Sequence, residues 1–283
     1  MIKTTTVKYR IGVDIGGTKM CAILLANDRV IGEYTLATPT DDLNKFLVIL
    51  GALLEPLFEQ AKKDKIKISG IGIGIPAAIN NGKVMFAPNV PCLEGVKIVE
   101  LLHEKFDKKY QIEIENDANC FTLGEARLGA GKNKANIYGV IIGTGIGCGI
   151  FKDNKLDINS HELGSMVIDL REKLTIEQAY HRLTQNNPKL LAEEAYQGDE
   201  LATKLFEELG QVLGIGIANV INLIDPEIVI IGGSASQSSE LFLREIKKTV
   251  SELNVVQDKG EPKIVISKLG KLAGAIGAAL LIE

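Results

Sequence analysis

The sequence predicts an α/β fold of two lobes with similar design, and three observations lead to this prediction. Apolar segments with the two-residue period of strands alternate with segments that have helical spacing. A strand, a glycine-rich turn and a second strand occur near residues 9–26 and again near 136–151. The chain has 283 residues, of which 46% are hydrophobic, enough for the core of one large domain or of two lobes.

The first half of the chain shows strand signals before its first helix. Apolar residues alternate with others from Tyr9 to Ile15, which is typical of a strand with one buried face. Helically spaced apolar residues over 41–63, preceded by acidic ones, predict a long helix. Asn81-Gly82 within an apolar stretch indicates a hairpin. These patterns predict strands at 9–15, 20–26, 29–38, 68–75 and 111–115, a hairpin at 79–86, and helices at 41–63, 96–106 and 120–128.

The second half repeats this scheme with longer helices. Residues 136–142 form an apolar strand that ends in a glycine turn. The long helix at 199–224 is expected to stop at Asp225-Pro226, because proline cannot continue a helix. The predicted strands are 136–142, 148–151, 227–231 and 262–267, and the predicted helices are 176–183, 189–196, 199–224, 241–253 and 272–281.

Composition excludes several classes of protein. The net charge is −4 without a long basic run, which argues against nucleic acid as the main partner. No apolar run reaches the length of a membrane span, and no apolar segment of a signal peptide follows the first residues, so we expect neither. The scattered Cys21, Cys92, Cys120 and Cys148 are expected to be buried free thiols, as in a cytoplasmic protein.

The first glycine turn has the features of a phosphate site. Gly16-Gly17 after a strand permits a tight turn with positive φ, and the backbone N–H groups of such a turn suit phosphate oxygens. Asp14 could hold Mg²⁺ through water, and Thr18 and Lys19 could reach phosphate. An ordinary Gly-Gly hairpin remains the alternative. The segment is not a Walker loop, because no G-x-x-x-x-G-K-[ST] precedes a helix.

Two further glycine turns follow strands in the second half. Gly143-Thr144-Gly145-Ile146-Gly147 joins two strands and could face the first turn across a cleft, with donors for the other side of a nucleotide's phosphates. Gly232-Gly233-Ser234 follows a buried strand, where the backbone could approach an adenine. A plain strand-to-helix connection is the alternative for this third turn.

Asp117 is the candidate general base. It lies where a strand ends and a helix begins, a position that faces the cleft in open α/β folds. A carboxylate there can accept the proton of a hydroxyl that attacks a phosphoryl group. Because Asn116-Asp117 precedes a helix, a helix cap is the alternative, and one residue could fill both roles.

Three polar side chains could bind the hydroxyl groups of a sugar. Glu162 and Glu177 are carboxylates near apolar residues, and carboxylates accept hydrogen bonds from hydroxyl groups. Asn89 lies between Pro88 and Pro91 in a rigid turn. From the residues alone, a solvated or capping residue is the ordinary interpretation of each. The three histidines carry no clear functional signal.

Taken together, these segments resemble the ROK family of sugar kinases within the actin-like ATPase superfamily. The matching segments follow the family order over nearly the whole chain: 14–19, 72–76, 87–91, 115–119, 143–147, 162–164 and 225–234. In such kinases the first two turns bind ATP phosphates, and the Gly232 turn lies near adenosine. By this resemblance, Asp117 matches the catalytic base, and the sugar contacts match Asn89, Asn116, Asp117, Glu162 and Glu177.

The resemblance also implies an architecture. It implies an actin-like, ribonuclease H-like fold with a mixed five-stranded sheet in each lobe and a cleft between them. We expect an N-terminal lobe at 1–119 and a C-terminal lobe at 120–269, with the helix at 270–283 returning to the first lobe.

The chain departs from the family at one loop. Members commonly follow Glu-Ile-Gly with a histidine and a cysteine-rich loop, which bind a structural zinc. Here Ser165 stands at the histidine position, and residues 165–177 contain no cysteine, so we expect no zinc. The apolar residues expected to pack this loop instead are Met166, Val167, Ile168 and Leu174.

The leading hypothesis is an ATP- and Mg²⁺-dependent kinase acting on a hexose, at the 6-hydroxyl, with glucose first and N-acetylmannosamine second. A non-catalytic, sugar-responsive regulator is the alternative of a different class. Family regulators carry an extra N-terminal DNA-binding domain, for which we expect no room before the strand at Tyr9. Family members often dimerise, which leaves a homodimer open.

Overall fold

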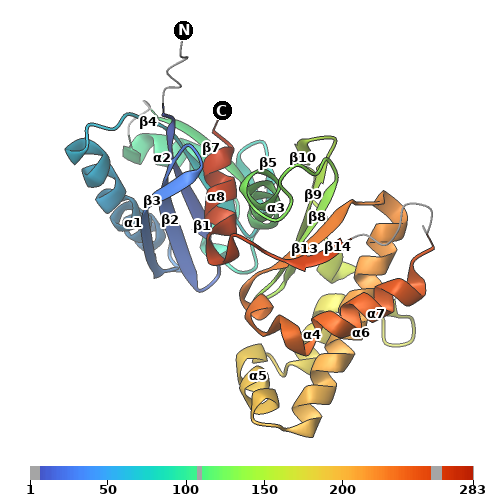
Figure 1. Ribbon diagram of the computed structural model, residues 1–283. Coiled ribbons are helices and arrows are strands. Elements are labelled where there is room, and N and C mark those ends of the chain that lie inside the picture. The colour runs from blue at the N-terminus through green and yellow to red at the C-terminus, as the bar shows by residue number, and fades with distance from the viewer. Residues whose placement is uncertain (1–6, 107–109, 256–262, 283) are drawn as a thin grey trace.

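The chain forms two five-stranded sheets with helices around them (Figure 1). The computed structural model describes residues 7–106, 110–255 and 263–282. Within these ranges every helix is too short or too polar to span a bilayer. Cys120 and Cys148 are buried free thiols, whereas Cys21 and Cys92 are only half-buried, contrary to the expectation for all four.

The first sheet has the strand order β3-β2-β1-β4-β7. Its strands are β1 (Tyr9–Ile15), β2 (Lys19–Ala26), β3 (Arg29–Ala37), β4 (Ile68–Ile75) and β7 (Gln111–Asn116). β1, β2 and β3 are antiparallel neighbours, while β1, β4 and β7 are parallel. Parallel strands bring their carboxyl ends to one edge, and there Asp14 pairs with Gly74, which pairs with Glu115.

The second sheet repeats this pattern in the order β10-β9-β8-β13-β14. Its strands are β8 (Ile137–Ile142), β9 (Ile146–Lys152), β10 (Lys155–Asp157), β13 (Ile228–Gly232) and β14 (Lys263–Ile266). An antiparallel hairpin again adjoins parallel strands. The repeat that the two glycine turns predicted is therefore present, and the short β10 was not predicted. The predicted strand at 262–267 begins at Pro262, outside the described residues.

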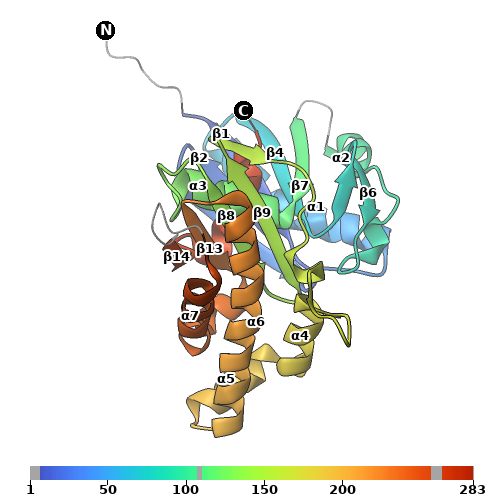
Figure 2. The ribbon, with the colours of Figure 1, turned by 90° about the vertical axis from the view of Figure 1, so that its right-hand side faces the viewer.

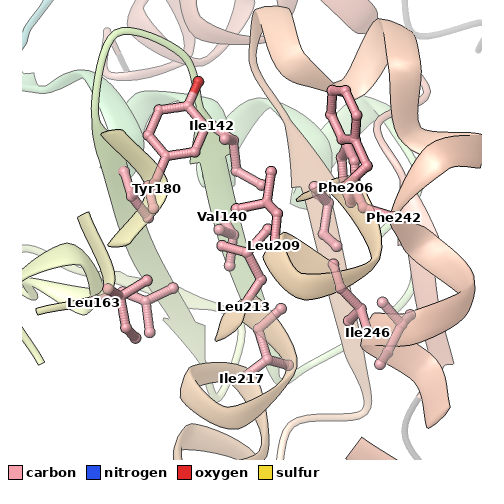
Figure 3. Close-up of a cluster of buried hydrophobic side chains, with 14 of the residues drawn as sticks. Val140, Ile142, Leu163, Tyr180, Phe206, Leu209, Leu213, Ile217, Phe242 and Ile246 are labelled. Carbon is pink, nitrogen blue, oxygen red and sulfur yellow. The ribbon is translucent and has the colours of Figure 1, made fainter. Parts of the chain in front are cut away.

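Helices cover the outer faces of both sheets. They are α1 (Leu43–Lys63) and α2 (Ile98–Phe106) beside the first sheet, and α4 (Ile176–Leu183), α6 (Glu200–Ile224) and α7 (Leu243–Leu253) beside the second. α5 (Pro188–Tyr196) packs on α6 and η3 instead of on the sheet. Figure 2 shows α6 between α4 and α7. In Figure 3, Leu209 and Leu213 of α6 lie over Val140 and Ile142 of β8. These contacts between helix and sheet belong to the hydrophobic core of the second half.

Two helices lie between the sheets, α3 (Asp117–Leu128) and α8 (Ala273–Leu280) (Figure 1). A Cβ atom at Gly12 would lie 1.9 Å from the Ala275 carbonyl oxygen of α8, and one at Gly72 would lie 1.7 Å from that of Ala278. Glycines thus let α8 pack directly on β1 and β4. The predicted single buried face of β1 is therefore wrong, because α8 covers the other face.

The remaining elements are two small hairpins and four 3₁₀ turns among the described residues. They are β5 (Ala78–Asn80), β6 (Lys83–Phe86), β11 (Val167–Asp169), β12 (Leu174–Thr175), and the 3₁₀ turns η1 (Pro91–Leu93), η2 (Leu163–Ser165), η3 (Ser234–Leu241) and η4 (Gly270–Leu272). β5 and β6 form the predicted hairpin, and its turn has positive φ at Asn81 and Gly82. Met166 and Ile168 pack on the core, but Val167 is 53% exposed, so its expected packing role is wrong.

The helix at the candidate base begins three residues earlier than predicted, at Asp117 instead of residue 120. The proposed lobe boundary at 119/120 therefore falls inside α3, a helix that contacts β8, β9 and α8. The division of the chain into lobes at that point stays a proposal.

Candidate active site

The first glycine turn is compact and tied to β3. The Gly16 N–H donates to the Lys19 carbonyl oxygen at 3.0 Å, and the Thr38 hydroxyl donates to the Gly16 carbonyl oxygen at 2.7 Å. Neither Gly16 nor Gly17 has positive φ, so that prediction is wrong. The turn packs closely on Asn89, because a Cβ atom at Gly17 would lie 3.2 Å from the Cβ of Asn89. The side chains of Thr18 and Lys19 are exposed.

Asp14 lies at the end of β1, against the first turn of α8. An added Cβ atom at Gly274 would lie 2.6 Å from Asp14 Oδ2. Burial raises the pKa of Asp14 to about 6, and the positive charge of Lys19 opposes this rise. The carboxylate is held at the sheet edge by β1 and has a cation beside it.

Asn116, not Asp117, is the cap of α3. The Asn116 Oδ1 accepts from the N–H groups of Ala118 at 2.9 Å and Asn119 at 3.3 Å, and its Nδ2 donates to the Ala77 carbonyl oxygen. Asp117 is the first residue of the helix, and its Oδ1 accepts from the Ala118 N–H at 2.9 Å. The capping function therefore rests mainly on Asn116.

The pKa of Asp117 is raised to about 7. Burial is the largest cause, followed by the negative charge of Asp14, while the N–H of Ala118 lowers the pKa and Glu162 raises it further. A carboxyl group with a pKa near neutrality can both accept and release a proton at physiological pH. A raised pKa of this kind is what a general base at this position would need.

Four carboxyl groups from both halves of the chain interact electrostatically. Asp14 and Glu162 both raise the pKa of Asp117, and Glu177 raises that of Glu162 after burial. Asp14 lies near the end of β1 and Asp117 directly follows β7, while Glu162 and Glu177 lie beside η2 and in the first turn of α4. The structure therefore brings the predicted Asp14, Asp117, Glu162 and Glu177 to one place.

The second glycine turn is anchored by α4 at both of its ends. The Ile146 N–H donates to Glu177 Oε2 at 2.8 Å, and the Tyr180 hydroxyl donates to the Gly143 carbonyl oxygen at 2.8 Å. A Cβ atom at Gly145 would lie 2.8 Å from Glu177 Oε2, so glycine makes room for this carboxylate. A Cβ at Gly147 would lie 3.1 Å from Ala118 of α3. Thr144 is exposed at the tip.

The third glycine turn borders a small cavity. Gly233 has φ +85°, and a Cβ atom there would lie 2.3 Å from the Ile142 carbonyl oxygen. A Cβ at Gly232 would meet the ring of Phe121 at 2.3 Å. The adjoining cavity has a volume of about 110 Å³ and is lined by Pro188, Lys189, Phe206, Ser234, Ala235, Gln237 and Ser238. It combines an apolar wall with hydroxyl and amide groups.

Asp14 is the residue of this site whose chemistry suits a magnesium ion. Among the described residues, no group of three or more His, Cys, Asp or Glu side chains could hold a metal ion. Mg²⁺ needs fewer protein ligands, since it binds through one or two carboxylates and keeps several waters. Asp14 fits this role, because Asp14 and Asp117 repel each other and a dication would relieve that repulsion.

Sequence reasoning missed two polar side chains at this site. Glu115 Oε1 accepts from the Asn116 N–H at 2.7 Å and from Asn119 Nδ2 at 3.1 Å, which braces the turn before Asp117. Tyr180 was overlooked because helical spacing marks it as a core residue. Glu115 carried a signal, since it directly precedes Asn116-Asp117, but its partners could not be read from the sequence.

Comparison with known proteins identifies the family. The model of the ROK family matches residues 10–283. The chain belongs to the ROK family. This confirms the family resemblance and the two-lobed actin-like α/β fold.

Relatives within the ROK family include both kinases and repressors. A glucokinase of Thermotoga maritima is 29% identical, covering 96% of this chain and 96% of the relative. A xylose repressor of Caldicellulosiruptor bescii is 27% identical, covering 96% of this chain and 77% of the repressor. The ROK glucokinase of Streptomyces griseus in complex with glucose and AMPPNP has a TM-score of 0.80 at 26% identity, covering 97% of this chain and 99% of that one.

Proposed function

We propose that this ROK protein is an ATP-dependent kinase that phosphorylates a hexose, with glucose as the favoured substrate and its 6-hydroxyl as the acceptor. The observation that carries the proposal is the meeting of Asp14, Asp117, Glu162 and Glu177 beside the glycine turns that follow β1 and β8. Similarity over nearly the whole chain to a glucokinase structure holding glucose and AMPPNP supports it.

Asp117 is the proposed catalytic base. Its carboxylate accepts the proton of the sugar hydroxyl as the hydroxyl oxygen attacks the γ-phosphorus of ATP, and the bond from that phosphorus to the β,γ-bridging oxygen breaks. The products are a sugar phosphate and ADP. Burial beside Asp14 supplies the raised pKa that a base working near neutral pH needs.

The nucleotide is proposed to lie along the three glycine turns. Gly16, Gly17, Thr18 and Lys19 would bind its phosphates from one side, and Gly143, Thr144, Gly145 and Gly147 from the other. Adenosine would occupy the cavity of about 110 Å³ beside Gly232 and Gly233. Asp14 would hold Mg²⁺ through water, and this ion would supply positive charge to the phosphate oxygens.

Sugar recognition is proposed for Asn89, Asn116, Glu162 and Glu177. Glu162 is accessible to solvent, although partial burial of its carboxyl group and the charge of Glu177 raise its pKa. Asn89 lies against Gly17 of the first turn. Asn116 Oδ1 already accepts two hydrogen bonds and its Nδ2 donates one within the protein, so a contact with sugar would use the second N–H of Nδ2. Ser165 of η2 is exposed and stands where the family commonly has a histidine. The residue therefore does not define which substituent the site accepts at the 2-position of the sugar. N-acetylmannosamine is therefore the alternative substrate.

A sugar-responsive regulator without catalysis is the second candidate function. The similarity to a xylose repressor over 96% of the chain favours it. Such a regulator would bind sugar without transferring phosphate. We also propose a cytoplasmic location. We propose a homodimer as well, and sedimentation of the purified protein would test that oligomeric state.

The experiment that tests the proposal is a coupled ADP-release assay with ATP and Mg²⁺. The panel contains glucose, mannose, fructose, allose, N-acetylglucosamine and N-acetylmannosamine, and calorimetry measures binding of each sugar. Sugar-dependent ADP release, strongest with glucose, is the expected result. Sugar binding without any ADP release would overturn the kinase assignment and favour the regulator.

A further inference from the structure

We propose that Tyr180 is a positioning residue that holds the second glycine turn in its phosphate-binding shape. The inference rests on the proposed kinase function, because it assigns a role in binding the ATP phosphates. Tyr180 is 1% exposed and belongs to the core of the second half, yet its hydroxyl points out of the apolar cluster in Figure 3. It donates to the Gly143 carbonyl oxygen at 2.8 Å.

This hydrogen bond fixes the orientation of one peptide group in the turn. The C=O of Gly143 and the N–H of Thr144 belong to the same planar peptide and point in opposite directions. Because the carbonyl oxygen points toward Tyr180, the Thr144 N–H points away from α4. Loss of the Tyr180 hydroxyl would allow this peptide to rotate and would remove a backbone donor from its fixed direction.

α4 makes a second contact with the same turn. Glu177 and Tyr180 are three residues apart, which places them on one face of a helix. Glu177 Oε2 accepts from the Ile146 N–H at 2.8 Å, so the two side chains bind the turn at its two ends. Burial and the charge of Glu177 raise the pKa of Tyr180 to about 12, so the hydroxyl stays protonated as a donor.

The helix that presents these side chains is itself rigidly held. Thr175 and Gln178 form a reciprocal capping box at its start. Ile176 is fully buried, and a Cβ atom at Gly216 of α6 would lie 2.3 Å from its Cδ1. A helix seated this closely on α6 can fix the turn, whereas a mobile helix could not.

Tyr180→Phe tests the inference, because it removes only the hydroxyl and keeps the buried ring. Tyr138→Phe is the matched control: Tyr138 is also 1% exposed, lies in the same cluster, and its hydroxyl is hydrogen-bonded to Cys148 and not to the turn. Calorimetry measures the affinity of both variants for ATP and for AMP in the presence of Mg²⁺. Steady-state kinetics measure the KM for ATP and for the sugar.

We expect Tyr180→Phe to weaken ATP binding about five- to tenfold, the range for one lost hydrogen bond. AMP affinity and the KM for sugar should change less than about twofold. Tyr138→Phe should change ATP affinity by less than about twofold. It should lower the melting temperature about as much as Tyr180→Phe does, because each variant loses one buried hydroxyl group. Unchanged ATP affinity in Tyr180→Phe, or equal losses for ATP and AMP, would overturn the inference.

The same measurements separate this inference from the proposed function. If the wild type binds ATP but transfers no phosphate to any sugar, the kinase proposal fails, and the role of Tyr180 is still decided by the ATP and AMP affinities. If the wild type binds neither nucleotide, both proposals are contradicted.

Discussion

At the scale of single residues, Asn116 and Asp117 divide two tasks that the sequence could not separate. Both residue types cap helices well, so the pattern alone allowed a base, a cap or both. In the structure Asn116 accepts from two N–H groups of α3, while Asp117 has a pKa raised to about 7. Which of the two neighbours caps the helix depends on where the helix begins, one residue after Asn116.

Asp117→Asn should lower kcat about 10²- to 10⁴-fold, the range for loss of a general base, while ATP affinity is retained. The matched control is Asp199→Asn at the cap of α6, where the side chain accepts from the Ala202 N–H at 2.8 Å. Asparagine caps equally well, so this variant should keep full activity. Equal turnover of wild type and Asp117→Asn in the coupled assay would rule out Asp117 as the base.

The same substitution should raise thermal stability above neutral pH. The pKa of Asp117 is raised on folding, so its contribution to stability is present at low pH and is lost as the pH rises through about 7. At pH 8 the ionised carboxylate destabilises the fold, and asparagine removes that charge. The melting temperature at pH 8 should rise by about 2–4 °C, the shift for roughly 1 kcal/mol, with no gain at pH 4.

The activity of the wild type should depend on pH through the same group. Because the base must be ionised, kcat/KM for the sugar should increase about tenfold per pH unit below pH 7 and level off above it. Initial rates between pH 5 and 9, with melting temperatures to confirm folding, check this. If kcat/KM did not change between pH 5 and 8, ionisation of a group with a pKa near 7 would not control the reaction.

At the scale of elements, the glycine-lined face of β1 and β4 is what allows α8 to lie between the sheets. Gly72→Ala places a Cβ atom 1.7 Å from the Ala278 carbonyl oxygen, which should cost about 2–3 kcal/mol and lower the melting temperature by roughly 5–10 °C. Gly51→Ala in α1 is the control. Its Cβ atom would meet only the flexible end of Lys105, so it should stabilise by about 0.5–1 kcal/mol. Equal melting temperatures for both variants would refute this packing.

Glu125 of α3 binds the segment that leads from β14 to α8, so it connects the two helices that lie between the sheets. The buried carboxylate accepts from the Ala130 N–H at 2.7 Å, the Ser267 hydroxyl at 2.6 Å and the Leu269 N–H at 2.8 Å. The segment at 267–269 leads from β14 to α8. Glu125 thus links α3 to the segment through which the chain returns to the first sheet.

Glu125→Gln should destabilise the protein by about 2–4 kcal/mol, because an amide nitrogen would then face N–H donors in a buried site. Glu227→Gln is the matched control, since Glu227 also accepts from two backbone N–H groups, at Ala135 and Asn136, but is exposed. Its loss should be smaller. Chemical denaturation measures both, and equal losses would show that burial of Glu125 adds nothing.

Local sequence patterns predicted most helices and strands. The strand and the side-chain contacts that were not predicted depend on residues far apart in the sequence. α4 has the predicted bounds, because a capping box and helical spacing mark them. β10 has only three residues and no apolar alternation of its own, so it forms by pairing with β9. Tyr180 and Gly143 are 37 residues apart, and Glu125 and Ser267 are 142 apart. No local pattern reports a bond between such distant residues.

At the scale of the whole molecule, the repeat of strand, glycine turn and strand explains why one site forms between two similar halves. Each sheet ends its parallel strands at one edge, and Asp14 and Asp117 of the first sheet interact with Glu162, which lies beside η2 in the second half. The sequence repeat and the motif order could predict this convergence. The side chains that orient the turns could not be predicted, because they come from helices that pack only in the folded chain.

Transfer of phosphate to a defined sugar hydroxyl tests the central claim most directly. The measurement is ³¹P NMR of a reaction containing the protein, ATP, Mg²⁺ and glucose, with 6-deoxyglucose in a parallel sample. The proposed function predicts a sugar-phosphate resonance that grows with ADP in the glucose sample and is absent with 6-deoxyglucose. A glucose sample in which ATP stays intact, although the folded protein binds both ATP and the sugar, would contradict the assignment of this chain as a kinase acting on glucose.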